Sequence, residues 1–213
     1  MNSSTRTTAI LLFFLALGAG IVFVGRDKPL PPVDSTGSSN SSATTISDSN
    51  IKLEKIERPN LDKKLIFPAG MSDASKRDAQ TKLRAIIEAL KARPTDAQMW
   101  NDLGLYRKLI EDYQGAREAW EYAALLLPTW SPPYSNLANL YTFEIKDLAK
   151  AEGYYAQAIE TDPQILDYYY HAHDFYIYHL KDVAKARAVL ELGIKNIDDK
   201  TDIPLREMLA ELK

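Results

Sequence analysis

The seven residues Ile145-Lys-Asp-Leu-Ala-Lys-Ala151 return 35 positions later as Leu180-Lys-Asp-Val-Ala-Lys-Ala186. One period earlier, Asp112 and Ala116 keep the same register. A period of about 20 to 50 residues is typical of proteins built from stacked copies of one structural unit. The repeated unit therefore decides the fold of this chain, and its residue types can be compared copy by copy.

Side chains of a fixed size follow the alanine of each copy. A large apolar residue lies four positions after it and a small residue lies seven positions after it. A small residue lets two antiparallel helices approach closely, a large one fills the space to the next pair, and proline ends a helix. The pattern therefore predicts helical hairpins. The positions are Ala116, Trp120, Ala123 and Pro128; Ala151, Tyr155, Ala158 and Pro163; and Ala186, Leu190, Gly193 and Asp198.

A first helix is predicted ahead of each of these second helices. Aromatic, leucine and small residues recur there at helical spacing and lie on one helical face. The anchors are Trp100, Leu103 and Gly104; Tyr134, Leu137, Ala138 and Tyr141; and Tyr169, Ala172 and Tyr176.

These anchors resemble the pattern of the tetratricopeptide-repeat family. That family has an aromatic residue, a leucine, a small residue and a tyrosine on the first helix, then alanine, an aromatic residue, alanine and proline on the second. The first repeat matches best, although Arg107 stands where the family has tyrosine. The second and third repeats carry one extra residue between their helices, and the third has His173 in place of a small residue. The resemblance implies an all-α right-handed superhelix of antiparallel helical hairpins that serves in binding.

The repeat domain is expected to span residues 72–213. Its first helix shows helical spacing through Leu83 and Leu90 and ends at Pro94, one period before Pro128, which makes it half of a repeat. At the other end, Asp202 can cap a last helix that covers the final hairpin. The expected parts are a half-repeat helix at 72–94, repeats at 97–130, 131–165 and 166–200, and a capping helix at 201–213.

The N-terminal region predicts a membrane anchor. After a short tail at 1–6, residues 7–25 carry no charge and are long enough to cross a hydrocarbon layer as a helix. The alternative is a cleaved signal peptide, because Arg6 is basic and Ala16-Leu17-Gly18 loosely resembles a cleavage site. Basic residues flank both ends of the apolar stretch, so the orientation stays open, with the extracytoplasmic side preferred for the repeats.

Between the anchor and the repeats we expect a tether. Residues 26–50 are rich in proline, serine and threonine and hold too few apolar residues to form a core, which predicts a flexible linker. Residues 51–71 alternate apolar and charged side chains and contain prolines, which predicts an extended segment.

Composition argues against several classes of chemistry. The chain has no cysteine, so it has no disulfide, thiolate metal site or cysteine nucleophile, and its 26 basic and 29 acidic residues are interspersed. No basic footprint for nucleic acid, glycine-rich phosphate loop or nucleophile elbow is present. Asp167, His171 and Asp174 share a helix face, yet no histidine pair has the spacing of a helical zinc site. We therefore predict no enzyme, cofactor, metal site or small-molecule substrate.

The resemblance implies that a protein or peptide partner binds in a concave groove formed by the first helices. The family's carboxylate clamp is not expected, because Asn139 lies beside neutral residues and Asp167 and Asp174 follow. The groove is therefore predicted to hold a neutral or basic segment; alternatively, its polar residues only solvate it. Family register places there Asn101, Leu105, Lys108, Ser135, Asn139, Thr142, Tyr170, Asp174 and Ile177.

Three functions are consistent with this organisation. The chain is predicted to be a membrane-anchored scaffold that recruits or organises proteins. The alternatives are an accessory subunit that docks a catalytic partner in an envelope complex and a secreted or periplasmic repeat domain released by signal-peptide cleavage.

Overall fold

A computed structural model describes residues 57–198 and 201–212 of this chain. The predicted tail at 1–6, anchor at 7–25 and linker at 26–50 lie outside the described residues, as does the first part of the segment at 51–71. No helix in the described ranges is long and apolar enough to span a bilayer. The helices are α1 (Asp73–Ala92), α2 (Ala97–Leu109), α3 (Tyr113–Leu126), α4 (Pro132–Leu140), α5 (Leu148–Thr161), α6 (Leu166–Asp174), α7 (Val183–Asn196) and α8 (Ile203–Glu211), with π-helices η1 (Tyr141–Ile145) and η2 (Phe175–Leu180).

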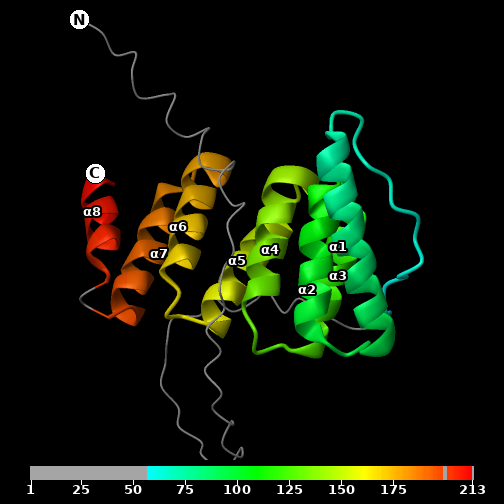
Figure 1. The fold of residues 1–213 in the computed structure, drawn as a ribbon. Coiled ribbons are helices and arrows are strands. Elements are labelled where there is room, and N and C mark those ends of the chain that lie inside the picture. The colour runs from blue at the N-terminus through cyan, green and yellow to red at the C-terminus, as the bar shows by residue number, and fades with distance from the viewer. Residues whose placement is uncertain (1–56, 199–200, 213) are drawn as a thin grey trace, which may run out of the picture. The chain divides into compact units, whose positions relative to one another are not determined.

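The helices pack in chain order (Figure 1). Three antiparallel hairpins are formed by α2 with α3, α4 with α5, and α6 with α7. The second helix of each hairpin contacts the first helix of the next, while α1 packs on α2 and α8 packs on α7. The prediction of an all-α stack of helical hairpins is therefore confirmed.

The aspartate of the repeated heptapeptide, and Asp112 at the same position of the first repeat, start the second helix of each hairpin. Asp112, Asp147 and Asp182 are the N-cap residues of α3, α5 and α7. Their carboxylates accept hydrogen bonds from the backbone N–H three residues on, at 3.0, 3.1 and 2.9 Å. An aspartate at this position satisfies an N–H that has no partner within the helix and lies favourably at the positive end of the helix dipole.

The aromatic residue that opens each hairpin bonds to the end of the preceding second helix. Trp100 Nε1 donates to the Pro94 carbonyl at 2.8 Å, Tyr134 Oη to the Pro128 carbonyl at 3.1 Å, and Tyr169 Oη to the Pro163 carbonyl at 2.8 Å. The same contact thus recurs at all three junctions. Because Pro94 takes part in it, α1 occupies the place of a second helix.

The repeat signature lies mostly inside the domain. Its large side chains fill two adjoining apolar clusters, one around Trp100 and one around Trp120 and Tyr169. The two prolines at the helix ends differ, since Pro128 is exposed and Pro163 half-buried. The buried signature residues are Trp100, Leu103, Gly104, Ala116, Trp120, Ala123, Tyr134, Leu137, Ala138, Tyr141, Ala151, Tyr155, Ala158, Tyr169, Tyr176 and Ala186.

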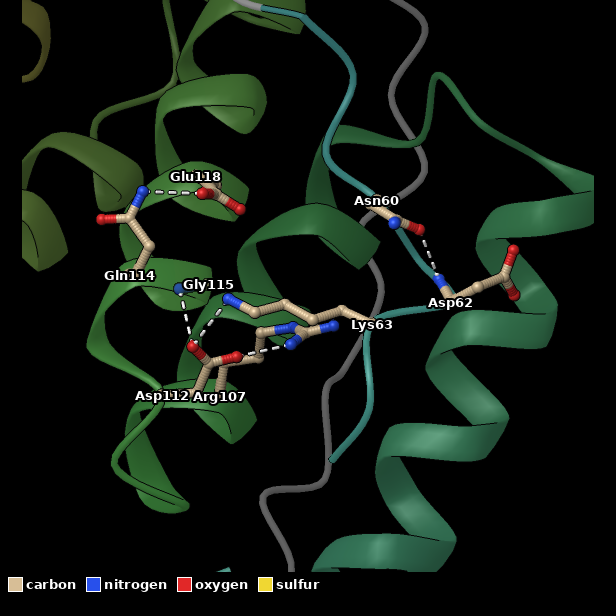
Figure 2. Close-up of polar contacts among 8 residues, drawn as sticks. All are labelled: Asn60, Asp62, Lys63, Arg107, Asp112, Gln114, Gly115 and Glu118. Carbon is tan, nitrogen blue, oxygen red and sulfur yellow. Dashed lines mark hydrogen bonds and ion pairs between the residues drawn. The ribbon is translucent and has the colours of Figure 1, made fainter. Parts of the chain in front are cut away.

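Arg107, at the position held by Tyr141 and Tyr176 in the other two repeats, is half of a buried ion pair. Its side chain is only 3% exposed, and its Nη1 lies 2.5 Å from Oδ2 of Asp112 (Figure 2). A Cβ on Gly115 would lie 2.5 Å from Cδ of Arg107 and 2.3 Å from Oδ2 of Asp112, so the pair requires a glycine there. The second and third repeats instead place Lys150 and Lys185 over the rings of Tyr141 and Tyr176.

The segment before α1 is a strap of extended chain at residues 57–71. Its apolar side chains pack against the cluster around Trp100. Figure 2 shows Lys63 reaching Asp112, and their Nζ and Oδ1 atoms are 3.1 Å apart. Asp62 lies 3.1 Å from Lys91, near the end of α1. The strap is therefore joined to both α1 and the start of α3. Its packed side chains are Leu61, Leu65, Phe67 and Met71.

The last helix, α8, closes the other end. Leu205 is fully buried, and a Cβ on Gly193 would meet Leu205 and the Tyr169 ring. Asp202 holds the N-cap position, as predicted for a capping residue, but its side chain makes no capping hydrogen bond. The carboxylate lies 2.6 Å from Arg206 instead.

The extra residue of the second and third repeats is absorbed by π-helical turns. From Trp100 to Ala116 the distance is 16 positions, whereas from Tyr134 to Ala151 it is 17. The first helices of the longer repeats end in η1 and η2, which widen the last turn by one residue per hydrogen-bonded ring. Each is followed by a lysine in the left-handed conformation, Lys146 (φ 63°) and Lys181 (φ 56°), and Glu111 (φ 61°) takes the same place in the first repeat.

The left-handed lysines give a test of this turn. We expect Lys181→Gly to raise the free energy of unfolding by about 0.5 kcal/mol and Lys181→Val to lower it by about 1 to 2 kcal/mol. Glycine relieves the steric conflict of a Cβ at positive φ, whereas a β-branched residue increases it. Urea denaturation followed by circular dichroism measures both. Ala188→Gly, an exposed change inside α7, should cost about 1 kcal/mol; an equal loss for Lys181→Gly would contradict the turn conformation.

Candidate binding surface

The first helices of the three hairpins lie side by side and form one layer. Asn136 Nδ2 of α4 donates to Asn101 Oδ1 of α2 at 2.9 Å. Lys108 of α2 lies 3.9 Å from Glu144 of η1. The rings of Phe143 and His179 join η1 to η2 with centroids 5.2 Å apart. These contacts connect α2, α4–η1 and α6–η2 without help from the second helices.

Two of the predicted groove residues are buried inside this layer. Asn101 is buried, and its amide oxygen accepts a hydrogen bond from Asn136. Thr142 is buried too, and its hydroxyl donates to the Ala138 carbonyl at 2.8 Å and lies 3.3 Å from the Tyr155 hydroxyl. Both side chains therefore join helices to one another instead of facing a partner.

The other predicted residues reach the surface. Leu105 is 45% exposed and Asp174 is exposed. Asn139 accepts a hydrogen bond from the Tyr155 hydroxyl at 2.9 Å. We call the accessible predicted set the first-helix face. It consists of Leu105, Lys108, Ser135, Asn139, Tyr170, Asp174 and Ile177, of which all but Leu105 and Asp174 are half-buried.

Acidic groups gather at the α6 end of the first-helix face. Burial raises the pKa of the Tyr170 hydroxyl, and the nearby charges of Asp167 and Glu207 raise it further. At the α2 end, burial also raises the pKa of the Asp102 carboxyl, with a contribution from Asp96. The carboxylates of Asp167 and Glu207 near Tyr170 would attract a cation placed next to α6.

The aspartate and histidine side chains of α6 do not assemble into a metal site. Asp167, His171 and Asp174 are all exposed on that helix. His173 is buried, and its Nδ1 lies 3.0 Å from Asp174 Oδ1. Across residues 57–198 and 201–212, no three histidine, cysteine, aspartate or glutamate side chains are placed to hold an ion.

Three large apolar residues beside this face were not singled out from the sequence. Leu109, Phe143 and Tyr178 are 55%, 54% and 62% exposed. They follow one another at offsets of 34 and 35 residues, at the last turn of each first helix. The repeat period alone could have found them, because the same position is large and apolar in every copy while falling outside the buried stripe.

Comparison with known proteins supports the fold. No protein-family model matches the chain, and no curated protein is similar to it. Among solved structures, the chain is similar to the crystal structure of MamA, with a TM-score of 0.51 and 21% sequence identity over 67% of this chain and 83% of that chain. At this level of identity the likeness bears on the fold alone. The described domain therefore has a tetratricopeptide-repeat-like fold of stacked antiparallel helical hairpins.

Proposed function

We propose that this protein is a membrane-anchored scaffold that binds another protein through the first-helix face. The observation that carries the proposal is the continuous layer of α2, α4–η1 and α6–η2. At one repeat position, occupied by Leu105, Asn139 and Asp174, the side chain is accessible in all three repeats. A fold of stacked hairpins offers an extended surface of this kind. Binding needs no group with catalytic chemistry, in agreement with a fold that is typical of protein-interaction scaffolds.

The bound segment is proposed to be extended and neutral or basic. Asp174 and Asp167 are exposed at the α6 end, and Glu207 lies near Tyr170. At the α2 end the charge of Lys108 is offset by Glu144, 3.9 Å away, and Leu105 offers an apolar contact. A basic residue of the partner would therefore lie toward α6 and an apolar residue toward α2.

The uncharged stretch at 7–25 is proposed to be the anchor, and residues 26–50 the tether. A flexible chain of about 20 residues has a root-mean-square reach on the order of 25 Å, which holds the repeats just clear of the lipid headgroups. The support for this part of the proposal is the length and composition of the segment.

The full-length chain, tagged at its C-terminus, provides the test. It is expressed in a membrane-bearing host, solubilised in mild detergent and captured, and its N-terminal mass and companions are identified. An intact N-terminus in the membrane fraction with a stoichiometric companion is the expected result. A soluble, N-terminally trimmed chain without companions would refute the anchored scaffold, and a companion enzyme would favour the accessory-subunit alternative.

A charge reversal tests the face itself. Asp174→Lys should weaken binding of the captured partner by roughly tenfold, because a like-charge contact replaces an attractive one. Glu191→Lys changes the charge by the same amount on the exposed side of α7 and should leave binding unchanged. Titration of the purified partner by calorimetry measures both. Equal affinities of Asp174→Lys and the unmodified chain would contradict the proposed face.

A further inference from the structure

Leu109, Phe143 and Tyr178 form a row of exposed apolar side chains, the turn-edge row. Its members come from adjacent repeats, and contacts between the residues that follow or precede them in the chain hold them close together. Lys108, beside Leu109, lies 3.9 Å from Glu144, which follows Phe143. The Phe143 ring lies edge-on to the ring of His179, which follows Tyr178, with centroids 5.2 Å apart. Each member is more than half exposed, whereas monomeric proteins rarely leave large apolar side chains grouped in water.

Charged residues accompany the row in a fixed order. Glu111, Lys146 and Lys181 occupy the same left-handed position at the end of each first helix, and all three are exposed. Glu111 lies two residues after Leu109, whereas Lys146 and Lys181 lie three residues after Phe143 and Tyr178. Lys108 and Glu144, which lie next to row residues, are 3.9 Å apart and offset each other. The left-handed position therefore adds an acidic group at the Leu109 end and a basic group at the Tyr178 end. This order gives the row a direction along which its charge changes sign.

We propose that the turn-edge row is a site of self-association, in which two copies pair their rows antiparallel about a twofold axis. In such a pair Phe143 meets Phe143 at the axis, and Leu109 of each copy meets Tyr178 of the other. Glu111 of each copy then lies opposite Lys181 of the other. A twofold interface is formed by the same patch on both partners. The turn-edge row suits such an interface, because the acidic end of one copy faces the basic end of the other when the rows are antiparallel.

The charge order favours a second copy over an anionic bilayer. Glu111 and the capping aspartates of each turn would be repelled by anionic headgroups, whereas Glu111 is matched by Lys181 of an antiparallel copy. The two Lys146 side chains are nearest the axis, and their length lets their ammonium groups diverge into water. Because the row is small, pairing should be weak in dilute solution and strengthened where chains share one membrane.

The absence of cysteine from the chain allows a matched test. Glu111→Cys, Lys146→Cys and Lys181→Cys place one thiol at equivalent turns with equivalent backbone conformation. In the full-length chain in mild detergent, Lys146→Cys should form disulfide dimers about tenfold faster than either of the other two variants alone. A mixture of Glu111→Cys with a size-tagged Lys181→Cys chain should cross-link as fast as Lys146→Cys.

Two further changes separate this interface from chance contact. Phe143→Glu should slow cross-linking through Lys146→Cys about tenfold, whereas Ile203→Glu, which changes an equally exposed residue of α8, should not. Glu111→Lys and Lys181→Glu should each slow it, and the double variant should restore it, because the opposite charges again face each other.

Equal cross-linking rates at the three turns would overturn the proposal. So would rapid cross-linking of Glu111→Cys with itself, which indicates a parallel arrangement. Two results together would assign the row to the bilayer instead. Unlabelled Lys146→Cys would form no disulfide dimers, and a separate sample with a dye on that thiol would report contact with phosphatidylserine liposomes. If Phe143→Glu abolished partner capture but left cross-linking unchanged, the row would belong to that partner. Since the row lies outside the first-helix face, an unchanged affinity of Asp174→Lys would leave this inference standing.

Discussion

Replacing Asp112 by alanine is expected to lower the free energy of unfolding by about 3 to 5 kcal/mol, because it leaves the buried guanidinium of Arg107 without its counter-charge. Arg107 is 3% exposed, so water cannot replace the lost carboxylate. The same change removes the cap of α3 at Gly115 and the contact of the strap through Lys63. Urea denaturation monitored by circular dichroism measures the loss.

The chain contains its own controls for this prediction. Asp147 and Asp182 cap α5 and α7 in the same way but have no buried arginine beside them, since tyrosines Tyr141 and Tyr176 stand in its place. Alanine at either should cost about 1 kcal/mol, the usual value of a helix cap. If Asp112→Ala cost no more than these two, the ion pair would contribute nothing beyond capping.

The ion pair also predicts how stability depends on pH. Burial alone would raise the pKa of the Asp112 carboxyl, but hydrogen bonds from Arg107, from the Gly115 N–H and from Lys63 bring it below its ordinary value. A carboxyl with a lower pKa in the folded chain adds stability above its unfolded pKa, about 4, and loses that stability as the pH falls through the folded pKa. The stability difference between the unmodified chain and Asp112→Asn should therefore be full at about pH 6 and shrink steadily below about pH 4. A difference independent of pH would argue against the ionised pair.

Replacing Trp120 by alanine should lower the free energy of unfolding by about 3 to 5 kcal/mol, the range for a large aromatic side chain removed from a packed core. Trp120 is 1% exposed and lies where α3 meets α2. Its Nε1 donates to the Asn101 carbonyl at 3.0 Å, so the change also leaves a buried acceptor without this partner. Trp130→Ala, in the half-buried loop before α4, should cost about 1 kcal/mol. Equal costs would contradict the central place of Trp120.

A double-mutant cycle tests why Gly104 faces Trp120. A Cβ on Gly104 would lie 2.3 Å from Nε1 of Trp120, so Gly104→Ala should cost about 2 to 3 kcal/mol by overpacking. In the Trp120→Ala background the same change should cost nothing, because the indole is gone and alanine favours the helix. A cost that is the same in both backgrounds would show that the two positions are not coupled.

Much of the architecture was predictable from spacing, because each residue class has a local mechanical role. The alanines, aromatics and aspartate caps repeat at one period, and each acts on the helix that contains it or on the next one. The junction contacts of Trp100, Tyr134 and Tyr169 with the preceding prolines follow the same rule, because they join neighbours in sequence. The repeat period is therefore enough to predict which neighbouring helices pack together.

The binding surface was predictable only in part. The repeat register assigns each position to a face of its own helix, but it does not say which side chains of other helices reach that face. The proposal that the first helices line a binding surface stays a prediction. Asn101 and Thr142 were predicted for a groove and are buried, because Asn136 and Tyr155 reach them from other helices. The exposed members, Leu105 and Asp174 among them, remain predictions until a partner is measured.

By itself, the sequence determined the class of the domain, an all-α stack of helical hairpins, because this depends on contacts within one repeat or between adjacent repeats. Only the tertiary structure decided which side chains are buried where the repeats pack together. In the structure Arg107, which departs from the repeat pattern, is half of an ion pair with Asp112. The strap contacts the same aspartate, and Leu109, Phe143 and Tyr178 lie exposed in one row. The physical reason is that burial depends on what approaches a side chain from elsewhere in the fold, and that approach has no fixed spacing along the chain.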